Sequence, residues 1–180
     1  MPTAVPTFRM AQALTRPAVP GTAQPAAALM LFGQFVGAWD LDVTYIAADG
    51  RTETLPGEWL FGWILEGCGV QDVWRVPPGQ HGNGPDDPPS GFGTTVRFYD
   101  PALEAWRSTW HGVIKGEVIA FIGRPAGDEI HLVHEDAHRI LRWAFFDIVG
   151  DSFAWRNENS TDAGRTWTCT QAMRARRRSY

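Results

Sequence analysis

From residue 39 almost to its end, the chain alternates apolar and polar residues in short runs that turn-forming residues separate. A period of two is typical of strands that have one buried face and one solvated face. The runs follow one another at a spacing of about 8–12 residues, which favours antiparallel hairpins over a sheet with helical crossovers. We therefore predict an all-β fold, an up-and-down antiparallel barrel of about ten strands.

The predicted strands are bounded by glycine, proline, aspartate and similar turn residues. They cover residues 39–47, 52–65, 68–76, 94–99, 105–113, 117–123, 129–135, 139–147, 152–159 and 166–174. Gly37-Ala38-Trp39 stands at the mouth of the first strand, and Pro56-Gly57 is expected to bend the second, because proline cannot donate to a sheet ladder. Barrels of this kind usually hold a small ligand.

The N-terminal part of the chain lies outside this pattern. Residues 1–25 place prolines among small residues with no period, which predicts a flexible, disordered arm. Residues 26–36 carry apolar residues at helical spacing, among them Leu29 and Phe32, and predict a short helix that closes one barrel end. Residues 26–180 would then form a single barrel domain.

Residues 77–93, with the sequence PPGQHGNGPDDPPSGFG, form one long irregular insertion. Loops of more than about a dozen residues inside a compact domain are often lids or binding loops. One interpretation is a lid over a barrel mouth, with His81 or Phe92 reaching inward. The other is a surface loop without a role in binding.

Composition narrows the classes of partner. The chain has 180 residues and a formal net charge of −4, which argues against a nucleic-acid partner. No segment approaches the length of a membrane span, so no membrane partner is expected. Cys68 and Cys169 do not make a disulfide framework and are interpreted as reduced thiols. With no secretory signal in the sequence, these features predict a cytoplasmic protein.

The chain has nine tryptophans, more than the interior of one small barrel is expected to hold. Tryptophan forms flat apolar walls for ligands, so the expected partner is a small apolar or aromatic molecule. Tryptophans left on the outer surface would favour a homodimer.

The candidate chemistry depends on which strand faces turn inward, because residues two apart share a face. One assignment brings charged and aromatic residues together inside the barrel. The candidate acids or bases on these faces are Glu58, Asp72 and Glu158, and the candidate proton shuttle, at the end of an aromatic strand, is His111. The candidate ligand-binding residues are Arg97, Tyr99, Trp74, Trp110, Arg142, Arg156 and Gln171.

Other interpretations of the same residues stay open. A slip of one residue exchanges the faces of a strand and would turn Trp59, Trp63, Trp143 and Trp155 inward instead. Ion pairs that tie neighbouring strands together would also explain the charged residues. A half-exposed hairpin residue explains His111 better than a proton shuttle does.

The sequence offers no metal or cofactor site, and we expect no cofactor. Positions three apart on a strand point to opposite faces, so solvated histidines explain His131, His134 and His138 better than a metal does. Neither cysteine stands beside an activating histidine or helix start. Motifs for a serine nucleophile, a phosphate loop or a dinucleotide are absent. The arginines of residues 174–178 are interpreted as a solvated strand end.

Several motifs occur in an order that resembles a known family. They are Gly37-Ala38-Trp39-Asp40, Gly57-Glu58-Trp59, Asp72-Val73-Trp74, Arg97-Phe98-Tyr99-Asp100-Pro101, Trp106 with Trp110, Arg142-Trp143 and the run 153–167. Over most of residues 35–175 the chain is similar to a bacterial family of lipocalin-like, calycin-type β-barrels. The resemblance implies a ligand-binding barrel and no particular activity. A haem-binding barrel of the nitrobindin type is related in shape, but its glycine-rich opening motif is absent here.

Three hypotheses about function follow. The first is a barrel for a largely apolar or conjugated small molecule that acts as a cofactor-independent cyclase, isomerase or dehydratase, with carboxyl groups moving protons and arginines holding negative charge. The second is a non-catalytic carrier or sensor of such a molecule. The third is a role in assembly, in which side chains fill the interior and outer tryptophans form a dimer.

Overall fold

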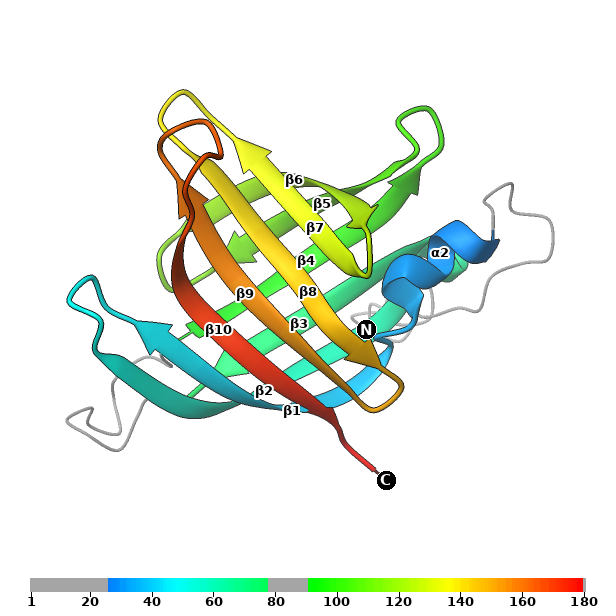
Figure 1. Cartoon of the computed structure of the whole chain (residues 1–180). Coiled ribbons are helices and arrows are strands. Elements are labelled where there is room, and N and C mark those ends of the chain that lie inside the picture. Colours follow the sequence, from blue (N-terminus) through cyan, green and yellow to red (C-terminus); the bar gives the residue numbers. More distant parts are fainter. Residues whose placement is uncertain (1–25, 78–90, 180) are drawn as a thin grey trace, which may run out of the picture.

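The computed structural model describes residues 26–77 and 91–179, and this part of the chain forms a closed barrel of ten antiparallel strands (Figure 1). The order around the barrel is β1-β10-β9-β8-β7-β6-β5-β4-β3-β2. Each strand therefore pairs with its neighbours in the sequence, and β1 closes the ring against β10. This confirms the predicted up-and-down barrel. The arm predicted for residues 1–25 lies outside the described residues.

The strands begin and end close to the predicted positions. They are β1 Gly37–Ile46, β2 Thr52–Ile64, β3 Gly69–Val76, β4 Gly91–Asp100, β5 Ala105–Gly112, β6 Glu117–Ala126, β7 Glu129–Glu135, β8 Ile140–Val149, β9 Ser152–Ser160 and β10 Thr168–Arg177. A single 3-10 turn, η1 (Leu65–Gly67), joins β2 to β3. The long strand β2 runs through Pro56-Gly57 without ending there.

Strand β10 begins later than predicted because a bonded loop precedes it. The Asp162 carboxylate accepts the backbone N–H of Thr166 at 2.9 Å and the hydroxyl of Ser160 at 2.8 Å. The pKa of Asp162 is lowered to about 2, first because the Thr166 hydroxyl and backbone N–H donate to its charged form. Thr166 is therefore part of the β9–β10 loop rather than the first residue of a strand.

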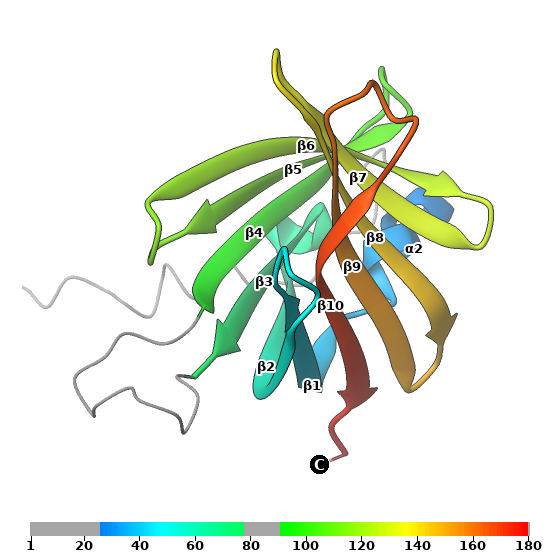
Figure 2. The same ribbon diagram turned by 60° about the vertical axis from the view of Figure 1, so that its left-hand side comes forward.

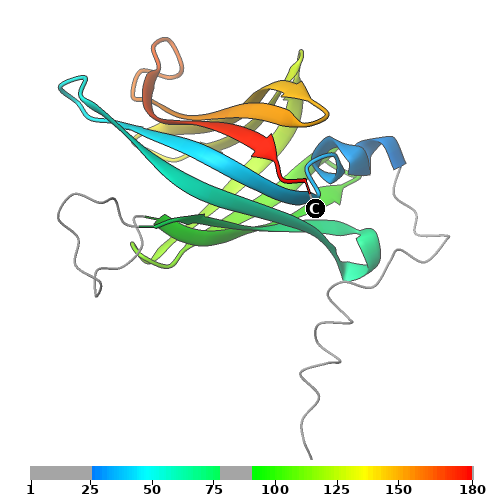
Figure 3. The same ribbon diagram turned by 90° about the horizontal axis from the view of Figure 1, so that it is seen from below.

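The helix α2 (Ala26–Gly33) closes one end of the barrel, as predicted. Figures 1 and 3 show it beside the end where β10 finishes. Phe32 and Phe35 are fully buried, and the Phe32 ring lies 5.1 Å from the ring of Trp106. The indole N–H of Trp106 donates to the backbone oxygen of Ala28 at 3.1 Å. Aromatic packing thus fills this end of the barrel.

The Gly-x-Trp motif joins the helix to the first and last strands. The indole N–H of Trp39 donates to the Phe35 carbonyl at 2.7 Å, and the Arg177 guanidinium lies 4.1 Å above the Trp39 ring. Arg177 also donates to the Val36 carbonyl at 2.8 Å. Gly37 has a φ of 134°, and a Cβ there would come within 2.7 Å of the Arg177 guanidinium. Glycine is therefore required at this position.

None of the nine tryptophans is exposed: all are buried or half-buried. Trp167 lies outside the barrel interior, in the β9–β10 loop against the outward-facing Arg142, as expected for part of this set. The homodimer stays a prediction. The part of the chain that the structure describes contains no helix long and apolar enough to cross a membrane.

Candidate functional site

The barrel end opposite α2 contains a cavity of about 280 Å³. The residues that line it come from the strand ends farthest from the helix and from the β5–β6 turn. Figure 2 shows these strand ends from another side. A second cavity of about 40 Å³ shares Trp74, Trp110, Trp143 and Gln171 with the first and adds Trp59, Thr95, Trp155 and Met173. The smaller cavity therefore lies against the floor of the larger one.

Five tryptophans from five different strands surround these cavities. We call this set the tryptophan ring; its members are Trp59, Trp74, Trp110, Trp143 and Trp155. The ring centroids are 6.0 Å apart for Trp74 and Trp110, 5.7 Å for Trp110 and Trp143, 5.5 Å for Trp143 and Trp155, and 6.2 Å for Trp155 and Trp59. All four pairs are edge-to-face, an arrangement that stabilises aromatic pairs.

Glycines on β4 and β5 make room for two members of the tryptophan ring. A Cβ at Gly91 would overlap the ring of Trp74, and a Cβ at Gly93 would overlap the ring of Trp110. A Cβ at Gly112 would come within 2.7 Å of the Trp110 indole nitrogen. Glycine thus lets these rings lie flat against the wall and keeps the space in front of them open.

The rim of the larger cavity is polar. It includes Tyr45, Lys115, Glu117, Arg139 and Asn157, and the terminal amide of Asn157 donates to the Thr170 hydroxyl at 3.0 Å. Burial raises the pKa of Tyr45. The site therefore combines an apolar aromatic floor with neutral and charged groups at its mouth, as many small-molecule sites do.

The structure brings only part of the predicted site to this cavity. Trp74, Trp110 and Gln171 line it, as expected from the strand faces. Asp72 and Arg97 also turn inward, but they form a fully buried ion pair with each other on the helix side of the tryptophan ring. Asp72 also accepts the backbone N–H of Thr95 at 3.1 Å, and the Arg97 guanidinium lies 5.1 Å from the Phe32 ring centroid.

The inward assignment is wrong for four of the charged candidates. Glu58, Arg142, Arg156 and Glu158 alternate with inward Trp59, Trp143 and Trp155 along β2, β8 and β9 and therefore lie on the outer surface. The alternative assignment of faces is correct for these strands. A closed barrel fixes the face of every strand through its neighbours, and this one turns the tryptophan faces inward.

The outer candidates form an ion-pair network across β7, β8 and β9. Glu158 contacts Arg142 at 2.8 Å and Arg156 at 3.1 Å. Arg156 also donates to both carboxylate oxygens of Glu129, at 3.1 and 2.8 Å, and this contact lowers the pKa of Glu129. The Arg142 guanidinium lies 3.8 Å above the ring of Trp167. These contacts tie neighbouring strands together, as the second interpretation of the charges proposed.

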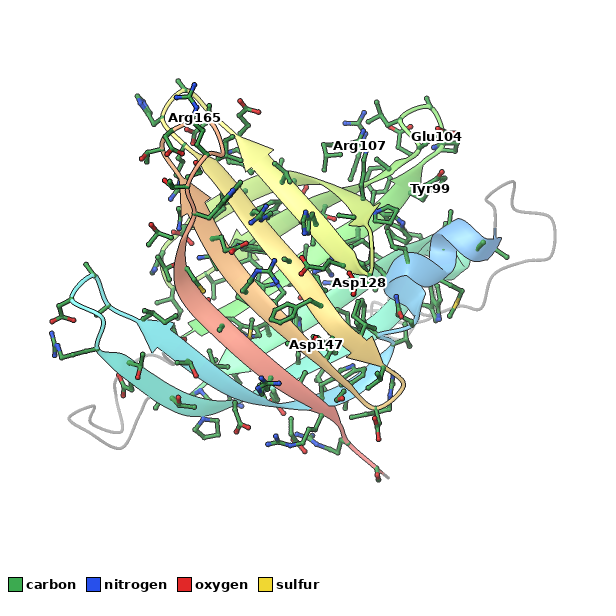
Figure 4. The ribbon with its side chains drawn as sticks, viewed as in Figure 1. Tyr99, Glu104, Arg107, Asp128, Asp147 and Arg165 are labelled. Carbon is green, nitrogen blue, oxygen red and sulfur yellow. The ribbon has the colours of Figure 1, made fainter. Side chains whose placement is uncertain are left out.

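Glu58 and two further candidates, His111 and Tyr99, lie away from both this network and the cavity. Glu58 lies on the outer face within 4.0 Å of Arg75 and 3.7 Å of Arg178. His111 is exposed on β5. It is next to the inward-facing Trp110 on this strand, so its side chain points to the outside of the barrel. Tyr99 lies beside Trp106 near the helix, with ring centroids 6.2 Å apart. Figure 4 labels Tyr99 at the β4–β5 end and Arg165 at the opposite end of the barrel.

The histidines and cysteines have ordinary surroundings. His131 contacts Glu129 at 2.7 Å, and His134 contacts the Ala120 carbonyl at 2.8 Å. Burial raises the pKa of Cys169, which disfavours the reactive thiolate. Within residues 26–77 and 91–179, no three His, Cys, Asp or Glu side chains come close enough to hold a metal ion.

The lid interpretation falls mostly on residues that the structure does not describe. His81 and the rest of residues 78–90 lie outside the described residues. Phe92 lies at the start of β4 and lines the larger cavity, with 39% of its surface exposed. A contribution of Phe92 to the mouth of the cavity is therefore observed, whereas the lid stays a prediction.

Several cavity residues were not among the principal candidates. They are Trp59, Trp143, Trp155, Tyr45, Thr95, Asn157 and Met173. The three tryptophans belong to the alternative assignment of faces. The cost of burying charge could have assigned Trp143 and Trp155 to the interior. If these two tryptophans pointed outward, the charged side chains of Arg142, Arg156 and Glu158 would lie inside the barrel.

No family model matches the sequence, and no curated protein matches it either. The fold, by contrast, is similar to solved structures. The S-type phycobiliprotein lyase CPES from Guillardia theta has a TM-score of 0.55 at 11% identity, over 83% of this chain and 92% of that chain. Rv2717c from M. tuberculosis has a TM-score of 0.58 at 14% identity, over 87% of this chain and 100% of that chain. At these identities the likeness shows a shared calycin-like barrel fold.

Proposed function

We propose that this protein binds a small, largely apolar, conjugated molecule in the cavity above the tryptophan ring and acts as a carrier or sensor of it. The observation that carries the proposal is the ring itself, because its five tryptophans from separate strands line the smaller cavity and three of them also line the larger one. Aromatic walls with a few polar groups are the usual lining of a small-molecule site. We also propose that the chain belongs to the bacterial family of lipocalin-like barrels that its motifs resemble.

The cavity volume sets the size of the ligand. The larger cavity measures about 280 Å³. A cavity of about 150 Å³ accommodates one benzene ring, so this one suits a body of roughly two fused or linked rings. Polar substituents of the ligand would lie at the rim, between Lys115, Glu117 and Arg139.

The distribution of carboxylates favours binding over acid–base catalysis. Among the described residues, the carboxylate in the lining of the larger cavity is that of Glu117, which is exposed at the rim. Asp72 is engaged by Arg97, and Glu58 and Glu158 lie on the outer surface. A carboxyl group outside the barrel has no access to a ligand inside it.

A cofactor-independent cyclase, isomerase or lyase is the second candidate. Asp72 favours it, because this interior carboxylate accepts the backbone N–H of Thr95, whose side chain lines the smaller cavity. One structural neighbour is a phycobiliprotein lyase, and this supports the candidate as far as a shared fold can. Native mass spectrometry of freshly purified protein, followed by incubation of any retained compound with excess protein, separates the two. A carrier returns the compound unchanged, and an enzyme converts it.

Binding is tested with naphthalene, a two-ring apolar probe, in a ¹H–¹⁵N spectrum of the indole N–H groups. The nine tryptophans give nine indole signals, which single Trp→Phe variants assign. We expect saturable shifts for members of the tryptophan ring and none for Trp167, whose N–H donates to the Gly164 carbonyl at 3.0 Å outside the cavity. Absence of saturable shifts in the whole ring would refute the proposed function.

A matched pair of variants measures the contribution of the cavity wall. Trp110 and Trp167 are both half-buried, but only Trp110 lines the cavity. Trp110→Ala removes about 50–60 Å² of apolar contact with the probe, which corresponds to about 1.4 kcal/mol or a tenfold weaker Kd. Trp167→Ala should change the Kd by less than about twofold. Equal effects of both variants would contradict the location of the site.

A further inference from the structure

Three buried polar atoms around the smaller cavity have no hydrogen-bond partner in the described part of the chain. They are the indole nitrogens of Trp59 and Trp155 and the hydroxyl oxygen of Thr95. The three residues are 3%, 4% and 1% exposed, and all of them line the 40 Å³ cavity. A buried N–H or O–H that donates to nothing costs free energy, so native proteins rarely keep one without a reason.

The other tryptophans show that this fold does satisfy indole N–H groups. Those that donate to a protein acceptor are Trp39, Trp74, Trp106 and Trp167. Trp74 belongs to the tryptophan ring itself, and it donates to the sulfur of Met173 at 3.3 Å. Among the described residues, Trp59 and Trp155 are the tryptophans whose indole nitrogens are buried and have no acceptor, and both line the smaller cavity.

The two unsatisfied indoles lie close together. Trp59 on β2 and Trp155 on β9 have ring centroids 6.2 Å apart and planes at 88° to each other. A space that holds one water needs at least about 10–15 Å³, so 40 Å³ accommodates one oxygen atom and the atoms attached to it. The larger cavity lies next to this space and shares four lining residues with it.

We propose that the smaller cavity is an oxygen-acceptor subsite that takes a carbonyl group at the inner end of the ligand. The indole N–H groups of Trp59 and Trp155 and the hydroxyl of Thr95 donate to that oxygen. The inference rests on the proposed function and narrows the ligand to conjugated ketones, aldehydes, quinones or lactams. A neutral oxygen fits better than a carboxylate, because these donors are uncharged and no charged side chain lines the smaller cavity.

The test compares 2-acetylnaphthalene with 2-isopropylnaphthalene, two probes of nearly the same shape that differ in the carbonyl oxygen. We expect the ketone to bind about tenfold more tightly or better, because at least two neutral donors gain an acceptor. In the indole ¹H–¹⁵N spectrum, the ketone should move the Trp59 and Trp155 N–H protons downfield, as new hydrogen bonds do. The hydrocarbon should leave these two protons without such a shift.

Trp155→Phe removes one donor and keeps an aromatic ring at the same place. It should reduce the ratio of ketone affinity to hydrocarbon affinity by about fivefold, because only the ketone loses a hydrogen bond. Trp143→Phe is the matched control, since Trp143 lines the same cavity but its indole nitrogen is not among the buried atoms without a partner. This control should keep the full preference. Thr95→Val tests the third donor in the same way.

The outcomes separate the subsite from the proposed function. If both probes bind with equal affinity and neither moves the Trp59 and Trp155 protons downfield, the smaller cavity holds water only and the inference is overturned, while binding stands. If neither probe shifts any member of the tryptophan ring, the proposed function itself fails. An equal loss of ketone preference in Trp143→Phe and Trp155→Phe would also overturn the assignment of the donors.

Discussion

Breaking the buried ion pair between Asp72 and Arg97 by removing one partner should destabilise this barrel strongly. Both side chains are completely buried, and the pair lies among the aromatic residues that α2 packs against. Asp72→Asn keeps the size of the side chain but leaves the Arg97 guanidinium charged and without its carboxylate. Removing one partner of a buried pair costs about 3–5 kcal/mol, because the remaining charge is no longer compensated.

Urea unfolding followed by tryptophan fluorescence measures this cost. For a slope of about 2 kcal/mol/M, a loss of 3–5 kcal/mol lowers the unfolding midpoint by roughly 1.5–2.5 M. Arg97→Met should be similarly destabilising, because it leaves the Asp72 carboxylate buried beside the single backbone N–H of Thr95. The double variant Asp72→Asn/Arg97→Met removes both charges, so it should be at least about 2 kcal/mol more stable than the sum of the single effects predicts.

Two results would refute this reasoning. A cost below about 1 kcal/mol for Asp72→Asn would mean that the pair is solvated or dispensable. Single effects that add within about 0.5 kcal/mol in the double variant would mean that the two charges do not interact. Naphthalene binding to the folded Asp72→Asn variant gives a second readout. An unchanged affinity for naphthalene would support a purely structural role for Asp72, and a lower affinity would support a direct contact between Asp72 and the ligand.

Three further predictions concern the wall, the loop and the outer network. In Gly91→Ala the new Cβ would overlap the Trp74 ring, so it should push that ring into the cavity and weaken naphthalene binding about tenfold. The control is Gly62→Ala, which has open space around its Cβ and should bind naphthalene as the wild type does. Equal titration curves for the two variants would contradict this. The lowered pKa of Asp162 predicts stability that is full above about pH 4 and is lost as the pH falls towards 2, and acid unfolding of Asp162→Asn should lack that component. Glu158→Gln should leave the naphthalene Kd within about twofold of wild type, and a larger change measured by the same titration would bring Glu158 back into the site.

Much of the fold follows from local sequence signals. Alternation of apolar and polar residues locates the strands, and turn residues such as Gly50 and Gly150 separate them. Hairpins between consecutive strands leave little choice of neighbours, so the up-and-down order follows as well. The Gly37-Ala38-Trp39 motif marks the first strand because glycine makes space there for the Arg177 guanidinium.

The candidate site was predictable only in part, because a strand has two faces and the chain does not mark which one is inside. Trp74, Trp110 and Gln171 were assigned correctly, whereas Arg156 and Glu158 were placed on the wrong side of β9. Bulges add to the difficulty. The register of β10 against β9 shifts between Cys169 and Gln171, so faces cannot be counted through this strand from its end.

The sequence by itself determined the number and order of strands, the closing helix and the abundance of aromatic side chains, since each depends on local periodicity or composition. Only the tertiary structure decided which end is filled and which is open. Phe32 and Phe35 fill one end, while the tryptophan ring leaves space at the other. The physical reason is closure: once β1 pairs with β10, every strand face is fixed by its neighbours, and the arrangement with fewest buried charges prevails.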